Sequence, residues 1–138
     1  MKIKVTQLKE NQVVFLKESV SPEQIDLDTP EIKYSNPIIV STEAKKECSV
    51  VHAKTHVSAS AVFICSRCLN KYTNAIEKDF AITYPLNEIQ HFIDITEDIR
   101  EEMIAHYPVK FLCQPECKGL CPQCGKNLNE ERCNCTRQ

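Results

Sequence analysis

Apolar and polar residues alternate most clearly in the middle of the chain. Between residues 51 and 63, odd-numbered positions are mostly apolar, and even-numbered positions carry histidine, lysine and serine. Between residues 72 and 84, the large apolar side chains fall on even numbers, and a proline ends the run. A period of two is typical of a strand with one buried face. The two runs predict an antiparallel hairpin whose connection, residues 65–71, contains Cys65 and Cys68.

Weaker strand patterns precede this hairpin. Residues 1–18 contain two short apolar runs separated by a polar break at residues 10–12, which predicts two short strands. Prolines make residues 19–42 mostly irregular, with residues 38–40 as an edge strand. Cys48 has no close cysteine partner and precedes the long strand, so we expect it to be a small buried side chain.

One short helix is predicted after the hairpin. Residues 94–97 match a capping box, in which Asp94 accepts an early helix amide and Glu97 reaches back. Ile99 and Met103 continue at helical spacing until a proline stops the helix. Together these patterns predict an α+β protein with an antiparallel β core, one short helix and a C-terminal zinc-knuckle segment.

Composition excludes several functional classes. The 138 residues, 42% hydrophobic with a formal charge of −2, fit one soluble domain with or without a small appendage. Only Gly119 and Gly125 are glycines, so a dinucleotide fingerprint, a phosphate loop and a nucleophile elbow are absent. The N-terminus lacks the apolar run of a signal peptide, and no stretch approaches the ~20 apolar residues of a membrane helix. We therefore expect a reducing, cytoplasmic setting, in which paired cysteines indicate metal ligands before disulfides.

Eight of the nine cysteines form four close pairs along the chain. Zinc takes four thiolates at about 2.3 Å, and a tight turn of one to three residues can bring two sulfurs to one ion. The count therefore predicts two closed zinc sites. The predicted ligands, in four pairs, are Cys65 and Cys68, Cys113 and Cys117, Cys121 and Cys124, and Cys133 and Cys135.

We consider two ways in which the four cysteine pairs can be combined around two ions. In the simplest, the third and fourth pairs close a local knuckle, and the first pair meets the second. In the other, the first pair joins the third in a zinc-ribbon arrangement. Residues 113–135 hold few apolar side chains and cannot build a core alone, so they need a metal staple. We expect a β-rich core domain over residues 1–108 and a metal-binding segment over residues 109–138, docked on the hairpin tip.

Catalysis is not the expected role of these groups. A thioredoxin-like redox pair opens a helix after a strand, whereas strands are predicted on both sides of the first cysteine pair. Catalytic zinc needs an open position, generally with histidine or carboxylate ligands. His52 and His56 share a strand face but lie about 13 Å apart at ~3.3 Å per residue, too far to hold one ion. The other two histidines lack suitable neighbours in the sequence.

The cysteine-rich string resembles one known family. Residues 112–129 (LCQPECKGLCPQCGKNLN), the closing Cys-Asn-Cys and the earlier residues 65–69 (CSRCL) are similar to the bacterial YceD family, the large ribosomal RNA subunit accumulation proteins. The resemblance covers about residues 45–135. It implies a non-enzymatic factor that supports accumulation of large-subunit ribosomal RNA, with metal at the matching cysteines. Relatives generally continue past the last cysteine pair into a basic, leucine-containing stretch, and contacts of that stretch are not expected here, where residues 136–138 end the sequence.

Three functional hypotheses follow. The first is a zinc-stapled ribosome-biogenesis factor that contacts large-subunit ribosomal RNA or a ribosomal protein, without a membrane or a small-molecule substrate. Its contacts would use a small basic face formed by Arg67, Lys71, Lys118 and Lys126. The second is a protein-binding adaptor without direct RNA contact, since two four-thiolate zinc sites would move the formal charge from −2 to about −6. The third is a thiol redox protein with labile metal.

Overall fold

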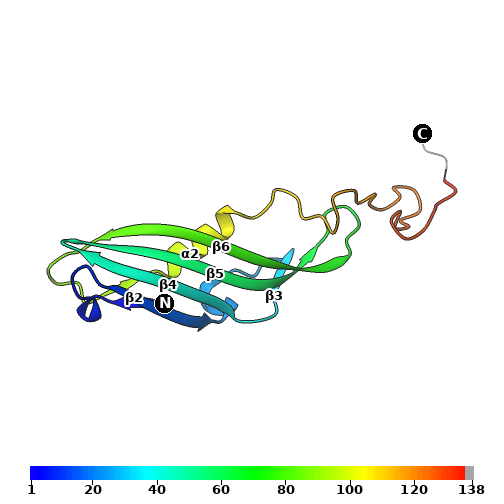
Figure 1. Ribbon diagram of the computed structural model, residues 1–138. Coiled ribbons are helices and arrows are strands. Elements are labelled where there is room, and N and C mark those ends of the chain that lie inside the picture. Colours follow the sequence, from blue (N-terminus) through cyan, green and yellow to red (C-terminus); the bar gives the residue numbers. More distant parts are fainter. Residues whose placement is uncertain (136–138) are drawn as a thin grey trace.

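The computed structural model describes residues 1–135 (Figure 1), and residues 136–138, where the sequence ends, lie outside the described residues. The predicted class is confirmed, because the described chain is mostly antiparallel β-sheet with a cysteine-rich C-terminal segment. The elements in chain order are β1 (Lys2–Lys4), the 3-10 helix η1 (Val5–Gln7), β2 (Val13–Val20), α1 (Pro22–Ile25), β3 (Ile32–Tyr34), β4 (Ile38–Glu47), β5 (Val50–Ile64), β6 (Lys71–Pro85), β7 (Phe92–Asp94) and α2 (Thr96–Ala105).

The β5–β6 hairpin is the longest feature of the molecule, as the alternation predicted. The two strands pair antiparallel from Val50 opposite Pro85 to Ile64 opposite Lys71. Odd-numbered residues of β5 from 51 to 63 are buried, and the residues between them are more exposed. The turn between the strands therefore holds the first cysteine pair at the far end of a rigid ribbon, next to the C-terminal segment (Figure 1).

The main sheet has five strands, and β5 lies inside it. One edge of β5 pairs with β6, and the other pairs with β4 and, further along, with β3. The expectation of a short edge strand at residues 38–40 is wrong, because β4 spans ten residues and lies between β2 and β5. Its polar centre is tolerated because the buried Thr42 hydroxyl hydrogen-bonds Thr55 at 3.1 Å. The three-residue strand β3 was not predicted, since prolines flank it.

One hydrophobic core lies between this sheet and a covering layer. The layer consists of the small β1–β7 sheet and the two helices, and Figure 1 shows α2 on one side of the sheet. Ile3, Ile95 and Ile99 of the layer are fully buried and belong to the same cluster as Val51 and Val57 of β5. All buried members of this core precede the cysteine-rich segment, and a separate small cluster joins Cys65 and Cys68 of the hairpin tip to Cys117 of that segment.

Residues 1–135 contain two α-helices and the 3-10 helix η1, instead of the single predicted helix. The one-turn helix α1 was not predicted. Helix α2 buries Ile99 and Met103, as its spacing indicated. Asp94 accepts the amide of Thr96, the first residue of α2, at 3.0 Å, as predicted. The capping box itself is wrong, because the buried Ile95 is the N-cap residue and Glu97 pairs with Arg100 at 3.3 Å. Neither helix of the described chain is long and apolar enough to cross a membrane.

Cys48 is exposed, which contradicts the expectation of a buried side chain. It lies in the two-residue turn between β4 and β5 with a φ of 52°, and its amide donates to Glu10 Oε1. Cys48 lies in a tight turn at the end of the strand pair and not in a strand, so the buried face of the sheet does not include it.

Candidate metal centre

The first cysteine pair is held in a tight knuckle at the hairpin tip. The amide of Cys65 donates to the carbonyl of Asn70 at 2.9 Å, and the amide of Leu69 donates back to the carbonyl of Cys65 at 2.9 Å. Leu69 closes the turn with a left-handed φ of 60°. These bonds fold residues 65–70 into a loop that brings the sulfurs of Cys65 and Cys68 to one side.

Three contacts bring the chain after α2 to this tip. The amide of Ser66 donates to the carbonyl of Phe111 at 2.7 Å, and the Phe111 ring lies 5.3 Å from that of Phe63. Further along, the Arg67 guanidinium donates to the carbonyl of Cys117 at 2.8 Å. These contacts place the second cysteine pair beside the first, although 45 residues separate Cys68 from Cys113.

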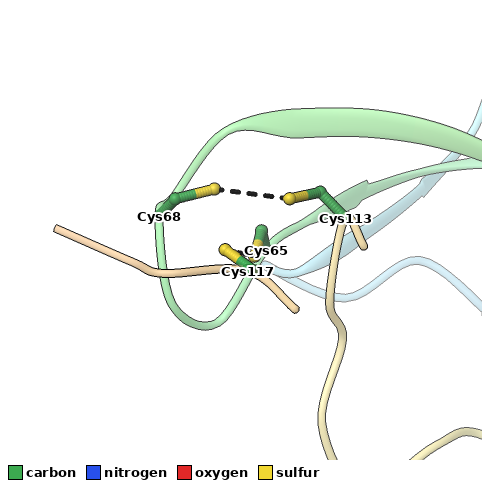
Figure 2. A group of neighbouring side chains, drawn as sticks. All are labelled: Cys65, Cys68, Cys113 and Cys117. Atoms are coloured by element: carbon green, nitrogen blue, oxygen red, sulfur yellow. Dashed lines mark hydrogen bonds between the residues drawn. The ribbon is translucent and has the colours of Figure 1, made fainter. Parts of the chain in front are cut away.

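The four sulfurs of the first two pairs form a compact group, which we call the tip cluster. Cys65 Sγ lies 3.7 Å from Cys117 Sγ, and Cys68 Sγ lies 3.6 Å from Cys113 Sγ. Figure 2 shows one pair on the hairpin loop and the other on the incoming segment, with the sulfurs directed toward one another. Zinc–sulfur bonds of about 2.3 Å would set the sulfurs of a tetrahedron about 3.8 Å apart. The tip cluster therefore fits a tetrahedral four-thiolate metal site.

The remaining two pairs form a second group, the tail cluster, consisting of Cys121, Cys124, Cys133 and Cys135. Its sulfurs, like those of the tip cluster, all lie within 4.8 Å of one another. Its knuckle repeats the first in hydrogen bonding, because the Cys121 amide donates to the Lys126 carbonyl and the Gly125 amide donates to the Cys121 carbonyl, both at 2.8 Å. Gly125 has a φ of 72° and takes the place that Leu69 takes at the tip.

The structure distinguishes between the two possible pairings. The sulfurs of the first and second pairs lie together, as do those of the third and fourth, so the zinc-ribbon arrangement is not the one adopted. All nine cysteines are free thiols. Strands flank the first pair on both sides, unlike a thioredoxin-like redox pair.

The pKa values of the thiols are uneven within each cluster. Burial raises the pKa of Cys65, but hydrogen bonds from the backbone of Cys68, Cys113 and Arg67 outweigh it and lower that pKa to about 6. Burial and contact with the neighbouring thiols raise the pKa of Cys113 to about 12. Four thiolates in contact repel one another, so full ionisation of the cluster needs a bound cation.

The tail cluster has the same electrostatic imbalance. Hydrogen bonds from the backbone of Cys124 and Gln123 lower the pKa of Cys121 to about 6. The side chain of Cys124, together with burial, raises the pKa of Cys135 to about 12. The tail cluster is more open than the tip cluster, because Cys124 is exposed while three of the four tip cysteines are buried.

Comparison with known proteins shows that the sequence carrying these clusters matches a protein family. A family described as "Large ribosomal RNA subunit accumulation protein YceD" matches residues 53–138. That range contains most of the β5–β6 hairpin, helix α2 and all eight clustered cysteines. The chain belongs to the YceD family. The resemblance in the cysteine string is thereby confirmed.

Individual relatives of this YceD-family protein match over shorter stretches. A chloroplastic protein of Arabidopsis thaliana, named large ribosomal RNA subunit accumulation protein YCED homolog 1, is 39% identical over 46 residues, which cover 33% of this chain and 14% of that protein. An uncharacterised protein of Mycobacterium bovis is 30% identical over 90 residues, which cover 54% of this chain and 44% of that protein. The chain thus spans less than half the length of these curated relatives. No solved structure matches it significantly.

The four basic residues predicted to form a contact face lie around the clusters, but they differ in whether their charged groups already have a partner within the molecule. Arg67 is engaged with the carbonyl of Cys117, and Lys126 pairs with Glu131 at 3.1 Å. Lys71 and Lys118 are exposed, and their ammonium groups have no ion pair within residues 1–135. Two of the four cations are therefore already used inside the molecule.

The histidines of the YceD-family chain lie apart from both clusters. His52 Nδ1 contacts Thr83 Oγ1 at 2.9 Å, and His56 Nδ1 contacts Asp79 Oδ1 at 2.8 Å, both on the sheet. No histidine joins a metal-binding group within the part of the chain that the structure describes.

Asn129 is a site residue that sequence reasoning missed. Its side-chain amide donates to Cys117 Sγ at 3.3 Å, although it belongs to the segment between the two halves of the tail cluster. The sequence offers one indication, since amide donors stabilise thiolates and this asparagine follows a Cys-x-x-Cys-Gly knuckle. Spacing alone does not show which cluster it faces.

Proposed function

We propose that this protein is a non-enzymatic ribosome-assembly factor of the cytoplasm that supports accumulation of large-subunit ribosomal RNA. The family match over residues 53–138 carries the proposal. The matched range also holds both sulfur clusters, which ties the proposed role to the cysteine-rich end of the molecule.

The proposal gives each cluster one structural zinc ion. Four thiols grouped within 4.8 Å are a complete ligand set without a position for substrate. Zinc in small modules supplies on the order of 10 kcal/mol of folding free energy, which the segment after residue 108 needs, as it has little core of its own. We therefore divide the chain into a β-rich core, residues 1–108, and a zinc-binding segment from residue 109 onward that docks on the hairpin tip.

The surface around the clusters is the proposed contact region for ribosomal RNA or a ribosomal protein. Lys71 and Lys118 are two exposed cations there that form no ion pair within residues 1–135, and Arg67 and Lys126 lie nearby on the two knuckles. Zinc binding would hold these residues in fixed positions relative to each other.

The central test is complementation in a bacterium that lacks its own YceD-family gene. We expect this chain to restore the ratio of large-subunit to small-subunit ribosomal RNA. The Cys117→Ser variant loses a tip ligand and should fail, whereas Cys48→Ser, which alters the exposed cysteine outside both clusters, should succeed. The proposal would be overturned if the Cys117→Ser variant restored the ratio, or if the parent chain left the ratio of the deletion strain unchanged.

A protein-binding adaptor is the second candidate function. The charge supports it, because two four-thiolate zinc sites would move the formal charge from −2 to about −6 and weaken attraction to phosphate. Pulldown with and without nuclease separates the two functions. Direct RNA contact predicts that exchanging Lys71 and Lys118 for glutamate abolishes RNA recovery, while the same change at the distant, exposed Lys9 and Lys17 does not. If the same partner proteins are recovered after nuclease treatment from both double variants, the protein is an adaptor.

A further inference from the structure

The segment between the two halves of the tail cluster reaches back to the tip cluster. Asn129 lies between Cys124 and Cys133, so metal binding at the tail cluster closes the loop that contains it. Its side-chain amide donates to the sulfur of Cys117, a tip ligand, at 3.3 Å. The contact joins a residue positioned by one cluster to a ligand of the other.

The oxygen of the same side chain fixes the backbone around that ligand. Asn129 Oδ1 accepts the backbone amide of Lys118 at 2.8 Å and the side-chain amide of Gln114 at 3.1 Å. Cys117 lies between these two residues in the sequence. Asn129 therefore holds the stretch on both sides of Cys117 while it donates to the Cys117 sulfur.

The loop itself fixes the orientation of Asn129. Asn127 Oδ1 accepts both the backbone amide and the side-chain amide of Asn129, at 3.1 and 2.8 Å. The Leu128 amide donates to the carbonyl of Gly119 at 2.9 Å, and the Glu131 amide donates to the carbonyl of Asn127 at 2.9 Å. The position of this amide depends on a folded loop, and the loop is closed by the tail cluster.

We propose that Asn129 is a positioning residue that couples the two metal sites: metal at the tail cluster orders the loop, and Asn129 then strengthens metal binding at the tip cluster. The inference rests on the proposed function, in which both clusters hold zinc. An amide that donates to a thiolate stabilises the ionised ligand, and losing such a partner typically lowers metal affinity 10- to 100-fold. Because coupling is reciprocal, metal at the tip also strengthens binding at the tail.

Asn129→Asp is the discriminating variant. A carboxylate has almost the shape of the amide and keeps an oxygen for the Lys118 and Gln114 donors, but it cannot donate to the Cys117 sulfur or to Asn127 Oδ1. Asn74→Asp is the matched control, because it adds the same charge at an exposed residue of β6 that belongs to neither cluster.

The measurement is zinc binding by the purified, reduced full chain in competition with a chelator. Alkylation of released thiols, followed by peptide mass mapping, reports the occupancy of each cluster separately. We expect Asn129→Asp to weaken zinc binding at the tip cluster about 10- to 100-fold and Asn74→Asp to leave it unchanged. We also expect Cys124→Ser, which disables the tail cluster, to weaken the tip by a similar factor. Combining Cys124→Ser with Asn129→Asp should weaken it no further.

Three results would overturn the coupling. They are parent-like zinc affinity at the tip in Asn129→Asp, an equal loss in Asn74→Asp, and factors that multiply when Cys124→Ser and Asn129→Asp are combined. With the tip cluster disabled by Cys117→Ser, Asn129→Asp should leave zinc binding at the tail unchanged, and a loss there would show that the variant unfolds the tail and would also overturn the coupling. A parent chain that binds no zinc contradicts the proposed function, whereas two independent zinc sites contradict only the coupling.

Discussion

At the scale of single residues, the two knuckles share a left-handed backbone conformation but place different side chains there. In each, the residue after the second cysteine adopts a left-handed φ, at Gly125 in the tail and at Leu69 in the tip. Leucine in this region costs roughly 1–2 kcal/mol relative to glycine, because its Cβ crowds the following carbonyl. Leu69 is also 62% exposed, so little burial offsets the cost.

We therefore expect Leu69→Gly to be more stable than Leu69→Ala by about 1 kcal/mol. Both variants remove the exposed side chain, and only glycine relieves the left-handed backbone. Urea unfolding of the metal-loaded protein measures the difference. Equal stability of the two variants would show that the Leu69 backbone is not strained.

Gly119 has a stricter requirement than Gly125. Both have a left-handed φ, of 76° and 72°, but a Cβ at Gly119 would lie 3.1 Å from the Arg67 carbonyl oxygen, whereas a Cβ at Gly125 would meet no atom within 4 Å. We expect Gly119→Ala to cost about 1–3 kcal/mol more than Gly125→Ala in the free energy of unfolding. The same urea experiment compares them, and a larger cost at Gly125 would contradict the close packing of the tail on the tip.

At the scale of elements, the β5–β6 hairpin performs two tasks with one alternating pattern. Its inner face supplies the centre of the core, and its turn presents the first two cysteines. The strand pairing extends without interruption up to Ile64 and Lys71, immediately before the knuckle. The core therefore determines where the tip cluster can form.

Helix α2 stabilises this arrangement by covering the inner face of the sheet. Ile99 is fully buried, whereas Ile104 on the same helix is 40% exposed. We expect Ile99→Ala to lower the free energy of unfolding by about 2–5 kcal/mol and Ile104→Ala by less than about 1 kcal/mol. Chemical denaturation of both variants checks the difference, and similar costs would mean that α2 does not pack as described.

At the scale of the whole molecule, a β core is joined to a cysteine-rich segment that, under the proposed function, depends on bound metal. Within residues 1–135 the core cluster contains twenty buried residues, whereas a second, small cluster consists of Cys65, Cys68 and Cys117. We therefore expect the first to fold without the second, and the second to need metal.

Metal removal should therefore make the cysteine-rich segment sensitive to protease while the β core stays resistant. After chelation we expect protease to cut within residues 109–135, while residues 1–108 resist, and Cys124→Ser should expose residues 113–135 even with metal present. Mass spectrometry of timed digests locates the cuts. The Cys48→Ser variant is the control and should be protected like the parent, and cleavage of the core as fast as the tail would contradict this division.

Local repetition made part of this structure predictable. Alternation of apolar residues determined the long hairpin, because a strand face repeats every two residues whatever lies around it. The close cysteine pairs and the count of eight thiols indicated two four-thiolate clusters, because the spacing within each pair is also a local property of the sequence. The burial of Ile99 and Met103 followed from helical spacing alone.

Contacts between distant residues decided the rest. β4 lies inside the sheet because β2 and β5 pair with its two edges, and β5 brings the Thr55 hydroxyl to the buried hydroxyl of Thr42. Docking of Phe111 and Cys117 on the tip selected the pairing of the clusters, and the amide of Asn129 acquired its role only once the tail loop closed beside them. The sequence by itself determined which groups can bind metal, since that depends on residue type and local spacing. Only the tertiary structure decided which groups share a site, because that depends on where the β core holds the hairpin tip.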